Sequence, residues 1–241
     1  MRSSDMSAAR QAMSPILTTS MEDYIKAIYK AQRRHGRATT VLIANRMQVS
    51  AASVTKMLKR LARFDLALYE PYQGAELTET GRCIALEIIR HHRLLELYLA
   101  ERMGYSWDEV DAEAEALEHV ISEAFEARID ALLGYPDTDP HGHPIPSREG
   151  HIRDNALYTP LDQIEAGERA VVRRVSDRDS CRLRRFGDLG LFPGRSVHVL
   201  AFEAGRLQMR VAGSPQEMES VLAEGVYVER AAPKRCMNGN G

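Results

Sequence analysis

Apolar residues recur at helical spacing through the first quarter of the chain. In residues 20–34 they fall on one face of a helix, and residues 40–47 and 53–64 repeat the period in shorter form. The link between the two short segments is brief, and Ser50 stands where it can cap the second of them. Three helices with a tight turn before the third predict a helix-turn-helix.

A hairpin pattern follows at once. Leu68–Tyr72 and Ala75–Leu77 flank Gln73-Gly74, a turn that needs a positive φ at Gly74. A hairpin directly after a recognition helix predicts a wing. We therefore expect a winged helix-turn-helix domain over residues 14–84, preceded by a disordered segment at 1–13.

The middle of the chain returns to the helical period. One helix is expected from Thr80 to about Met103, and a second, acidic helix over roughly Trp107–Leu133. The proline- and glycine-rich segment that follows predicts a structured loop. Residues 85–148 should therefore form an all-α domain, and 149–158 a linker.

From Thr159 the pattern changes to short β-rich runs separated by turn residues. The runs are Glu168–Val175, Ser196–Phe202, Arg206–Val211 and Val226–Arg230. They predict a small all-β barrel of about 70 residues over 159–231, with a disordered tail at 232–241. The fold class expected for the whole chain is α+β and multidomain.

Composition indicates the cellular compartment that we expect for the chain. The chain has 241 residues, and its apolar runs are far shorter than the roughly 18 residues of a membrane span. No apolar segment near the start predicts a signal peptide. Three scattered cysteines form neither a zinc motif nor a disulfide framework, which favours a reducing, cytoplasmic compartment.

Charge is distributed unevenly. Residues 14–84 hold 11 lysines and arginines against 6 acids, whereas residues 85–150 hold 5 against 15. A basic first third suits a polyanion, and an acidic, histidine-containing middle suits cations. The alternative is that both are ordinary solvated faces.

The third helix has the composition of a DNA-reading element. Its apolar residues form one stripe, and its polar face combines short hydroxyl side chains with basic ones. The basic residues suit phosphates and the hydroxyls suit groove edges. The predicted DNA-contacting residues are Arg46, Ser50, Ser53, Thr55, Lys56, Lys59 and Arg60.

Carboxylates and imidazoles are spaced as metal ligands on the predicted helices. Glu115, Glu118 and His119 share one helix face, and His92 stands on the preceding helix. Asp23 lies in the first turn of the first helix. Oxygen and imidazole donors without thiolates suit Mn(II) or Fe(II) better than Zn(II) or Cu(I). A solvated acidic face is the competing interpretation.

Two other classes of protein share some of these features. A carboxylate-bridged metalloenzyme or metal-storage bundle needs Glu-x-x-His motifs on two helices, and the chain has a single Glu-x-x-Glu-His segment instead. A winged-helix regulator that senses no metal fits the first domain equally well. No activated nucleophile and no P-loop motif appears, so we do not expect an enzyme.

The segments SMEDYIKAIY, VSAASVTKMLKRL, YEPYQGAELTETGR, HHRLLELYL and EALEHVIS, with HGHPIP behind them, resemble the diphtheria-toxin-repressor family of metal-dependent transcriptional repressors. The likeness runs from Thr19 to about Arg230. The segment RRFGDLGLFPG is similar to the SH3-like (FeoA-like) domain of the longer members. The resemblance implies a winged helix-turn-helix, an all-α dimerisation domain and a C-terminal SH3-like β-barrel.

The resemblance places the family's primary metal site on Asp23, His92, Glu115, Glu118 and His119. The iron-sensing branch has Met where Asp23 stands and Cys where Glu115 stands, so the acids here match the manganese-sensing branch. Lys26 is a departure, because bacillus-type manganese sensors have a bridging Glu at that position. A close binuclear centre of that type is therefore not expected.

A second site is also implied, at Glu96, Asp139, His141 and Asp179. Asp139 stands where streptococcal manganese regulators have Cys in a Cys-Pro-His-Gly loop. His143 is the nearest competitor, and Asp111 occupies a position that is His in the iron branch. Plain turn chemistry is the alternative for this loop.

Together these features imply a homodimeric, cytoplasmic repressor that responds to Mn(II), with Fe(II) as a second possible effector. Its partner is double-stranded operator DNA, whose symmetry matches paired recognition helices. No membrane and no small-molecule substrate is expected. An iron-dependent repressor of iron uptake is the nearest alternative.

Overall fold

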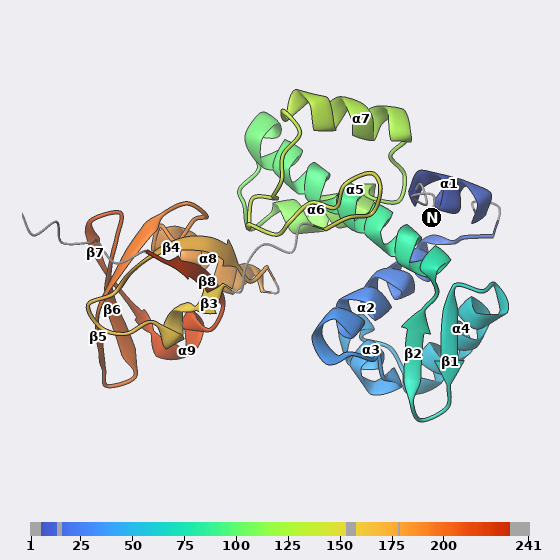
Figure 1. The fold of residues 1–241 in the computed structure, drawn as a ribbon, viewed down its shortest axis with the longest axis horizontal. Coiled ribbons are helices and arrows are strands. Elements are labelled where there is room, and N and C mark those ends of the chain that lie inside the picture. Colours follow the sequence, from blue (N-terminus) through green and yellow to red (C-terminus); the bar gives the residue numbers. More distant parts are fainter. Residues whose placement is uncertain (1–5, 14–15, 153–157, 178, 232–241) are drawn as a thin grey trace, which may run out of the picture.

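The computed structural model describes residues 6–13, 16–152, 158–177 and 179–231. Figure 1 shows an N-terminal helical unit with a two-stranded wing, a second helical unit above it, and a C-terminal β-sheet unit beside them. One long helix, α5, runs from the wing into the second helical unit. None of the described helices is long and apolar enough to cross a membrane.

The N-terminal domain is a winged helix. Its helices and strands are α2 (Thr19–His35), α3 (Thr40–Met47), α4 (Ala51–Arg63), β1 (Ala67–Glu70) and β2 (Gly74–Leu77). Buried Ile25, Ile28, Leu58 and Leu61 join α2 and α4 in one core. The two helices therefore belong to one packed unit.

Local sequence explains the turns of this domain. Ser50 caps α4 as predicted, with its hydroxyl accepting the Ser53 N–H at 3.2 Å. Gly74 has the predicted positive φ of 96°, and a Cβ there would lie 2.5 Å from the Ala38 carbonyl oxygen. The wing strands pair antiparallel, with Glu70 opposite Gly74.

The start of the chain differs from the sequence prediction. Residues 6–13, expected to be disordered, form helix α1 (Met6–Met13), which packs against α5. Residues 1–5 lie outside the described part. The segment is too short to be stable alone, so its contact with α5 supplies the stabilisation that sequence periodicity does not reveal.

The second domain is built on α5 (Glu79–Met103), α6 (Val110–Leu117) and α7 (Glu123–Leu132). The single acidic helix predicted over residues 107–133 is instead two helices. The chain leaves the helix after Leu117, and the Ser122 hydroxyl caps α7 by accepting the Phe125 N–H at 3.3 Å. Glu118 and His119 consequently lie in a turn between helices.

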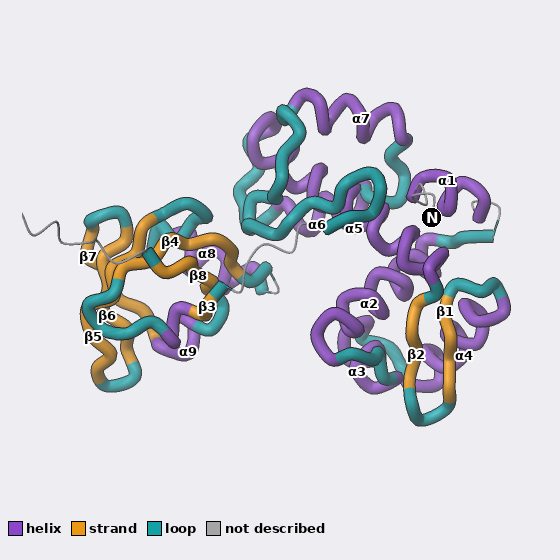
Figure 2. The backbone as a smooth tube through the Cα atoms, viewed as in Figure 1, coloured by secondary structure: helices purple, strands orange, loops and turns teal. Residues whose placement is uncertain are grey.

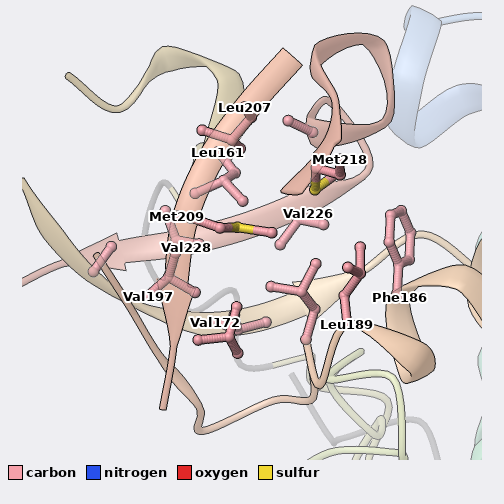
Figure 3. Packing of buried hydrophobic residues seen from close by; sticks show 14 of the residues in the cluster. Leu161, Val172, Phe186, Leu189, Val197, Leu207, Met209, Met218, Val226 and Val228 are labelled. Carbon is pink, nitrogen blue, oxygen red and sulfur yellow. The ribbon is translucent and has the colours of Figure 1, made fainter. Parts of the chain in front are cut away.

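The C-terminal domain is a six-stranded antiparallel sheet in the order β3-β8-β4-β5-β6-β7. The strands are β3 (Thr159–Pro160), β4 (Arg169–Val175), β5 (Ser196–Glu203), β6 (Arg206–Val211), β7 (Ser214–Glu219) and β8 (Val226–Arg230); the helices are η1 (Leu161–Gln163), α8 (Ser180–Asp188) and α9 (Ser220–Ala223). The predicted barrel is not closed, because β3 and β7 do not pair with each other in the described residues. Figure 3 shows Phe186 and Leu189 packed with Val172 and Met209 in its core.

The sheet domain contacts the helical domain through the loop at residues 139–143. Val175 N–H donates to the His141 carbonyl at 2.9 Å, and a Cβ on Gly142 would lie 2.0 Å from the Arg173 carbonyl oxygen. Trp107 packs on Phe192 with ring centroids 4.7 Å apart. Figure 2 shows how much of this side of the helical domain is loop. The loop is thereby held between the two domains.

Candidate metal centres

The turn after α6 brings donors from two domains together. His119 Nε2 lies 2.9 Å from Asp23 Oδ1 and 3.2 Å from Glu118 Oε1. Asp23 belongs to α2 of the winged helix, whereas Glu118 and His119 belong to the helical domain. These three residues form a compact donor group, which we call the interdomain triad.

The remaining predicted donors form a second group beside it. His92 Nδ1 lies 2.6 Å from Glu118 Oε2 and 3.8 Å from Glu115 Oε2. All five residues predicted for the primary site are therefore gathered in two groups that share Glu118. Glu118 is fully buried, whereas about half of the Glu115 side chain is exposed.

Lys26 lies within this second group. Its Nζ donates to Glu115 Oε2 at 2.7 Å and to Glu118 Oε1. Burial lowers the pKa of Lys26, but Glu118 and Glu115 outweigh it and leave the pKa above its ordinary value. A charged ammonium group therefore already neutralises Glu115 and Oε1 of Glu118, the carboxylate that the two donor groups share.

The ring of His119 is held from behind. Its Nδ1 donates to Glu22 Oε2 at 2.6 Å, so Nε2 is the nitrogen that faces Asp23 and Glu118. Burial lowers the pKa of His119, but hydrogen bonds with Asp23 and Glu22 raise it to about 9. Between carboxylates, Nε2 must carry either a proton or a cation. A divalent ion fits the interdomain triad in place of that proton.

The loop at residues 139–143 supplies another donor group, Asp139, His141 and His143. Asp139 Oδ1 accepts the N–H groups of His141 and His143, each at 2.9 Å. This is the turn chemistry considered as the alternative. It leaves Oδ2 of the buried Asp139 3.4 Å from His143 Nδ1 and 3.7 Å from Arg93 Nε. The turn therefore presents a carboxylate oxygen rather than consuming the whole group.

Buried polar atoms without hydrogen bonds converge here. His141 Nε2 donates to the Trp107 carbonyl at 2.8 Å, which leaves Nδ1 directed toward Glu96 Oε1 at 3.5 Å. Within the described residues His141 Nδ1, Glu96 Oε1 and His143 Nδ1 are buried and have no hydrogen-bond partner. A histidine that ligates a metal commonly donates its other ring N–H to a backbone carbonyl or a carboxylate. We call Glu96, Asp139, His141 and His143 the loop cluster, and its donors fit a cation.

The barrel residue predicted for this site has another role in the structure. Asp179 is exposed and caps α8, accepting the N–H groups of Cys181 at 2.8 Å and Arg182 at 3.3 Å. Asp177, two residues earlier, instead reaches to 3.9 Å from His143 Nδ1. Both acids are visible in the sequence. Which of them approaches His143 depends on how the sheet domain packs against the loop at residues 139–143.

His92 connects the two regions. Its Nε2 lies 3.2 Å from Asp111 Oδ1 and 3.5 Å from Glu96 Oε1, while its Nδ1 faces Glu118. Asp111 therefore belongs with His92 and Glu96 and lies apart from the loop at 139–143. None of the donor groups in the described residues contains a cysteine.

The predicted DNA face is largely exposed. Arg46, Lys56, Lys59 and Arg60 are exposed on α3 and α4. The hydroxyls of Ser50 and Ser53 lie 2.9 Å apart in the cap of α4. Thr55 is half-buried and donates to the Ala51 carbonyl at 2.9 Å, so its hydroxyl is engaged within its own helix. The basic side chains are the part of the prediction that is open to a ligand.

Three family models match successive parts of the chain. Residues 16–75 match the iron-dependent repressor N-terminal DNA-binding domain, and residues 78–147 match the iron-dependent repressor metal-binding and dimerisation domain. Residues 159–230 match the FeoA domain.

Whole-length relatives agree with these matches. The iron-dependent repressor IdeR of Mycobacterium tuberculosis is 31% identical over 229 residues, which cover 89% of this chain and 98% of that protein. The diphtheria toxin repressor of Corynebacterium jeikeium is 31% identical over 237 residues, with the same coverage. The chain belongs to the diphtheria-toxin-repressor family.

Solved structures of the family extend the comparison to the fold. A manganese-dependent transcriptional repressor in complex with manganese superposes with a TM-score of 0.79 at 36% identity, covering 88% of this chain and all of that one. The family likeness predicted from the sequence motifs is thus confirmed. Its relatives include both iron-dependent and manganese-dependent repressors.

Proposed function

We propose that the chain is a DNA-binding transcriptional repressor that acts as a homodimer when Mn(II), or alternatively Fe(II), occupies the interdomain triad. The observation that carries this proposal is the meeting of Asp23 with Glu118 and His119. An ion held by all three joins the winged helix to the helical domain. Since α2 and α4 share a core, the ion fixes the position of the recognition helix.

The donor set supports the choice of metal. Carboxylate and imidazole donors favour Mn(II) and Fe(II), and a thiolate would have favoured softer ions. Manganese-dependent and iron-dependent relatives both fit such a set. When bound, the ion supplies a cationic cross-link, and the residues of the chain supply its position and orientation.

Lys26 supports a single ion at this centre. Its ammonium bonds Glu115 Oε2 and Glu118 Oε1, the Glu118 oxygen that also faces His119, so we assign one divalent ion to the two groups together, on the side of the interdomain triad. This stoichiometry differs from a close binuclear centre.

The loop cluster is proposed as a second metal site. Its unpartnered atoms on Glu96, His141 and His143 supply the reason, and Asp139 and Asp177 supply negative charge. An ion there would tie α5 to the loop and to the C-terminal sheet domain. Its role would be to dock that domain, since the ligands proposed for it lie in the helical domain and the sheet domain.

The homodimer is supported by apolar residues exposed on the helical domain. Val120 is 74% exposed, Leu132 54% and Tyr135 71%. Exposed apolar residues gathered on one domain suit a protein interface. Two copies joined there would present paired recognition helices to a palindromic site.

The proposal is tested by DNA binding as a function of metal. Full-length chain stripped by chelator is titrated onto a palindromic duplex selected from a random pool, with Mn(II), anaerobic Fe(II), Zn(II) or Co(II). We expect Mn(II) to tighten binding by at least about tenfold. Equal affinity with chelator and with every metal would remove metal sensing and leave a metal-independent winged-helix regulator. Tightening by Fe(II) alone would assign the iron-dependent alternative.

A further inference from the structure

Helix α1 lies outside the family match, which begins at residue 16, yet it reaches the candidate centre through Arg10. The Arg10 side chain is only 15% exposed. Its guanidinium donates to Glu22 Oε1 at 2.7 Å, to Glu87 Oε1 at 3.4 Å and to the His119 carbonyl at 3.1 Å. One arginine thus contacts α2, α5 and the turn that carries His119.

Glu22 passes this contact on to the imidazole. Its Oε1 accepts from Arg10, and its Oε2 accepts from His119 Nδ1 at 2.6 Å. His119 Nε2 then lies within reach of Asp23 and Glu118. The order of contacts is therefore Arg10, Glu22, His119 and the interdomain triad.

Each step has a physical reason. A carboxylate on the second ring nitrogen fixes the tautomer and orientation of a ligating histidine and increases its basicity. A carboxylate buried as deeply as Glu22 is stable in its charged form only when paired. Arg10 supplies that pair with a planar fork, which also holds the backbone of His119.

The contact of Arg10 with Glu22 lies beside a cavity. A cavity of about 470 Å³ adjoins Arg10 and is lined by Glu22, Glu87, His119 and Ser122 among others. Glu22 and His119 already border this cavity, so without the Arg10 side chain only water would be left to pair with the Glu22 carboxylate from that side. Water would screen the carboxylate and leave the ring free to rotate.

We propose that Arg10 is a positioning residue for the interdomain triad, and that helix α1 acts through it to raise the affinity of that triad for a divalent ion. The inference rests on the proposed function, since it concerns the same metal centre. It assigns a role in metal response to a segment that precedes the family's DNA-binding domain.

The test measures Mn(II) binding to full-length chain by calorimetry. Arg10→Ala should weaken the tightest Mn(II) site by about tenfold, the low end for loss of an outer contact to a ligating histidine. Gln11→Ala, an exposed neighbour on the same helix, should leave that affinity unchanged. Arg10→Lys keeps the charge but loses the fork, so its affinity should fall between wild type and Arg10→Ala.

A double variant separates positioning from general support of the fold. If Arg10 acts through Glu22, Arg10→Ala combined with Glu22→Gln should bind Mn(II) no more weakly than Glu22→Gln alone. Equal Mn(II) affinity in wild type and Arg10→Ala, with only the melting temperature reduced, would overturn the inference. Additive losses in the double variant would also overturn it. A wild-type chain that binds no divalent ion would overturn the proposed function itself.

Discussion

Lys26 places a protein cation where neighbouring carboxylates and an imidazole would otherwise accept a metal. The ammonium belongs to α2, and its partners Glu115 and Glu118 belong to the helical domain. The winged helix is thus joined to the second domain by a buried ion pair that needs no metal. Removing one member of such a pair leaves an uncompensated buried charge.

Lys26→Glu should convert the centre from one ion to two. The new carboxylate would stand beside His92, Glu115 and Glu118, so Mn(II) stoichiometry should rise by one ion per subunit in calorimetry. Lys26→Met is the control, because it removes the charge without adding a ligand. We expect it to destabilise the metal-free chain by about 3–5 kcal/mol. Unchanged stoichiometry in Lys26→Glu would show that the ammonium does not hold a metal position.

Glu87 gives a pH dependence of stability. Burial raises its pKa to about 9, the nearby Glu123 adds to this, and Arg10 opposes it. The folded chain keeps a proton that the unfolded chain releases above its ordinary pKa near 4.5. The contribution of Glu87 to stability is therefore fully present at low pH and is lost as the pH rises toward 9.

Glu87→Gln should remove this dependence. The amide is neutral at every pH, so the variant should be more stable than wild type at pH 8 by about 1–2 kcal/mol and similar at pH 5. Chemical denaturation at the two pH values measures the difference. Glu79→Gln, at an exposed site on the same helix, is the matched control and should change little. If Glu87→Gln gained the same stability at pH 5 and at pH 8, Glu87 would not be protonated in the folded chain.

At the scale of single elements, helix α4 combines two kinds of predicted contact. Lys59 and Lys56 are both exposed on it, three residues apart. Lys56 lies nearer the N-terminal end of α4 than Lys59 does. Residues near that end of a recognition helix reach base edges first.

Lys59→Ala should weaken binding to all duplexes alike and reduce the salt slope by about 1, because it removes a phosphate contact. Lys56→Ala should change the preference among operator variants instead. Competition binding at several salt concentrations compares the two. A uniform loss from both variants would mean that the base-reading face was placed wrongly.

Elements with local signals could be predicted from sequence. The Ser50 cap and Gly74 each act within a few residues, so α4 and the wing were found as expected. Helix α1 was missed because its stability comes from α5. The break after Leu117 was missed because the spacing of apolar residues does not change at Ser122, the residue that caps α7.

The candidate site shows the same division. Spacing and family motifs gathered the five primary donors, and the structure brings them together. The resemblance implied Asp179, and Asp177 was missed because which acid approaches the loop depends on how the sheet domain meets it. The contact of Lys26 with Glu115 and Glu118 spans some 90 residues, and no local pattern encodes it.

At the scale of the whole molecule, the two candidate centres join different pairs of domains. The interdomain triad links the winged helix to the helical domain, and the loop cluster links the helical domain to the sheet domain. Only the first can act directly on the recognition helix. The second acts on how the C-terminal domain is held.

Two histidine variants separate these roles. His119→Ala should abolish Mn(II)-activated DNA binding even at saturating metal, since the triad loses its imidazole. His141→Ala should lose one ion per subunit yet keep reduced activation. Calorimetry and DNA titration on both variants measure this. If His141→Ala binds as many Mn(II) ions as wild type, the loop cluster is not a metal site.

The buried ammonium of Lys26 also bears on the steepness of the response. A centre that takes one ion per subunit fills with the first power of Mn(II) concentration, whereas a two-ion centre whose ions bind cooperatively approaches the second power. Lysine and glutamate codons differ by a single base. A gradual sensor and a sharp switch are therefore one point mutation apart on this scaffold, with the rest of the metal centre unchanged.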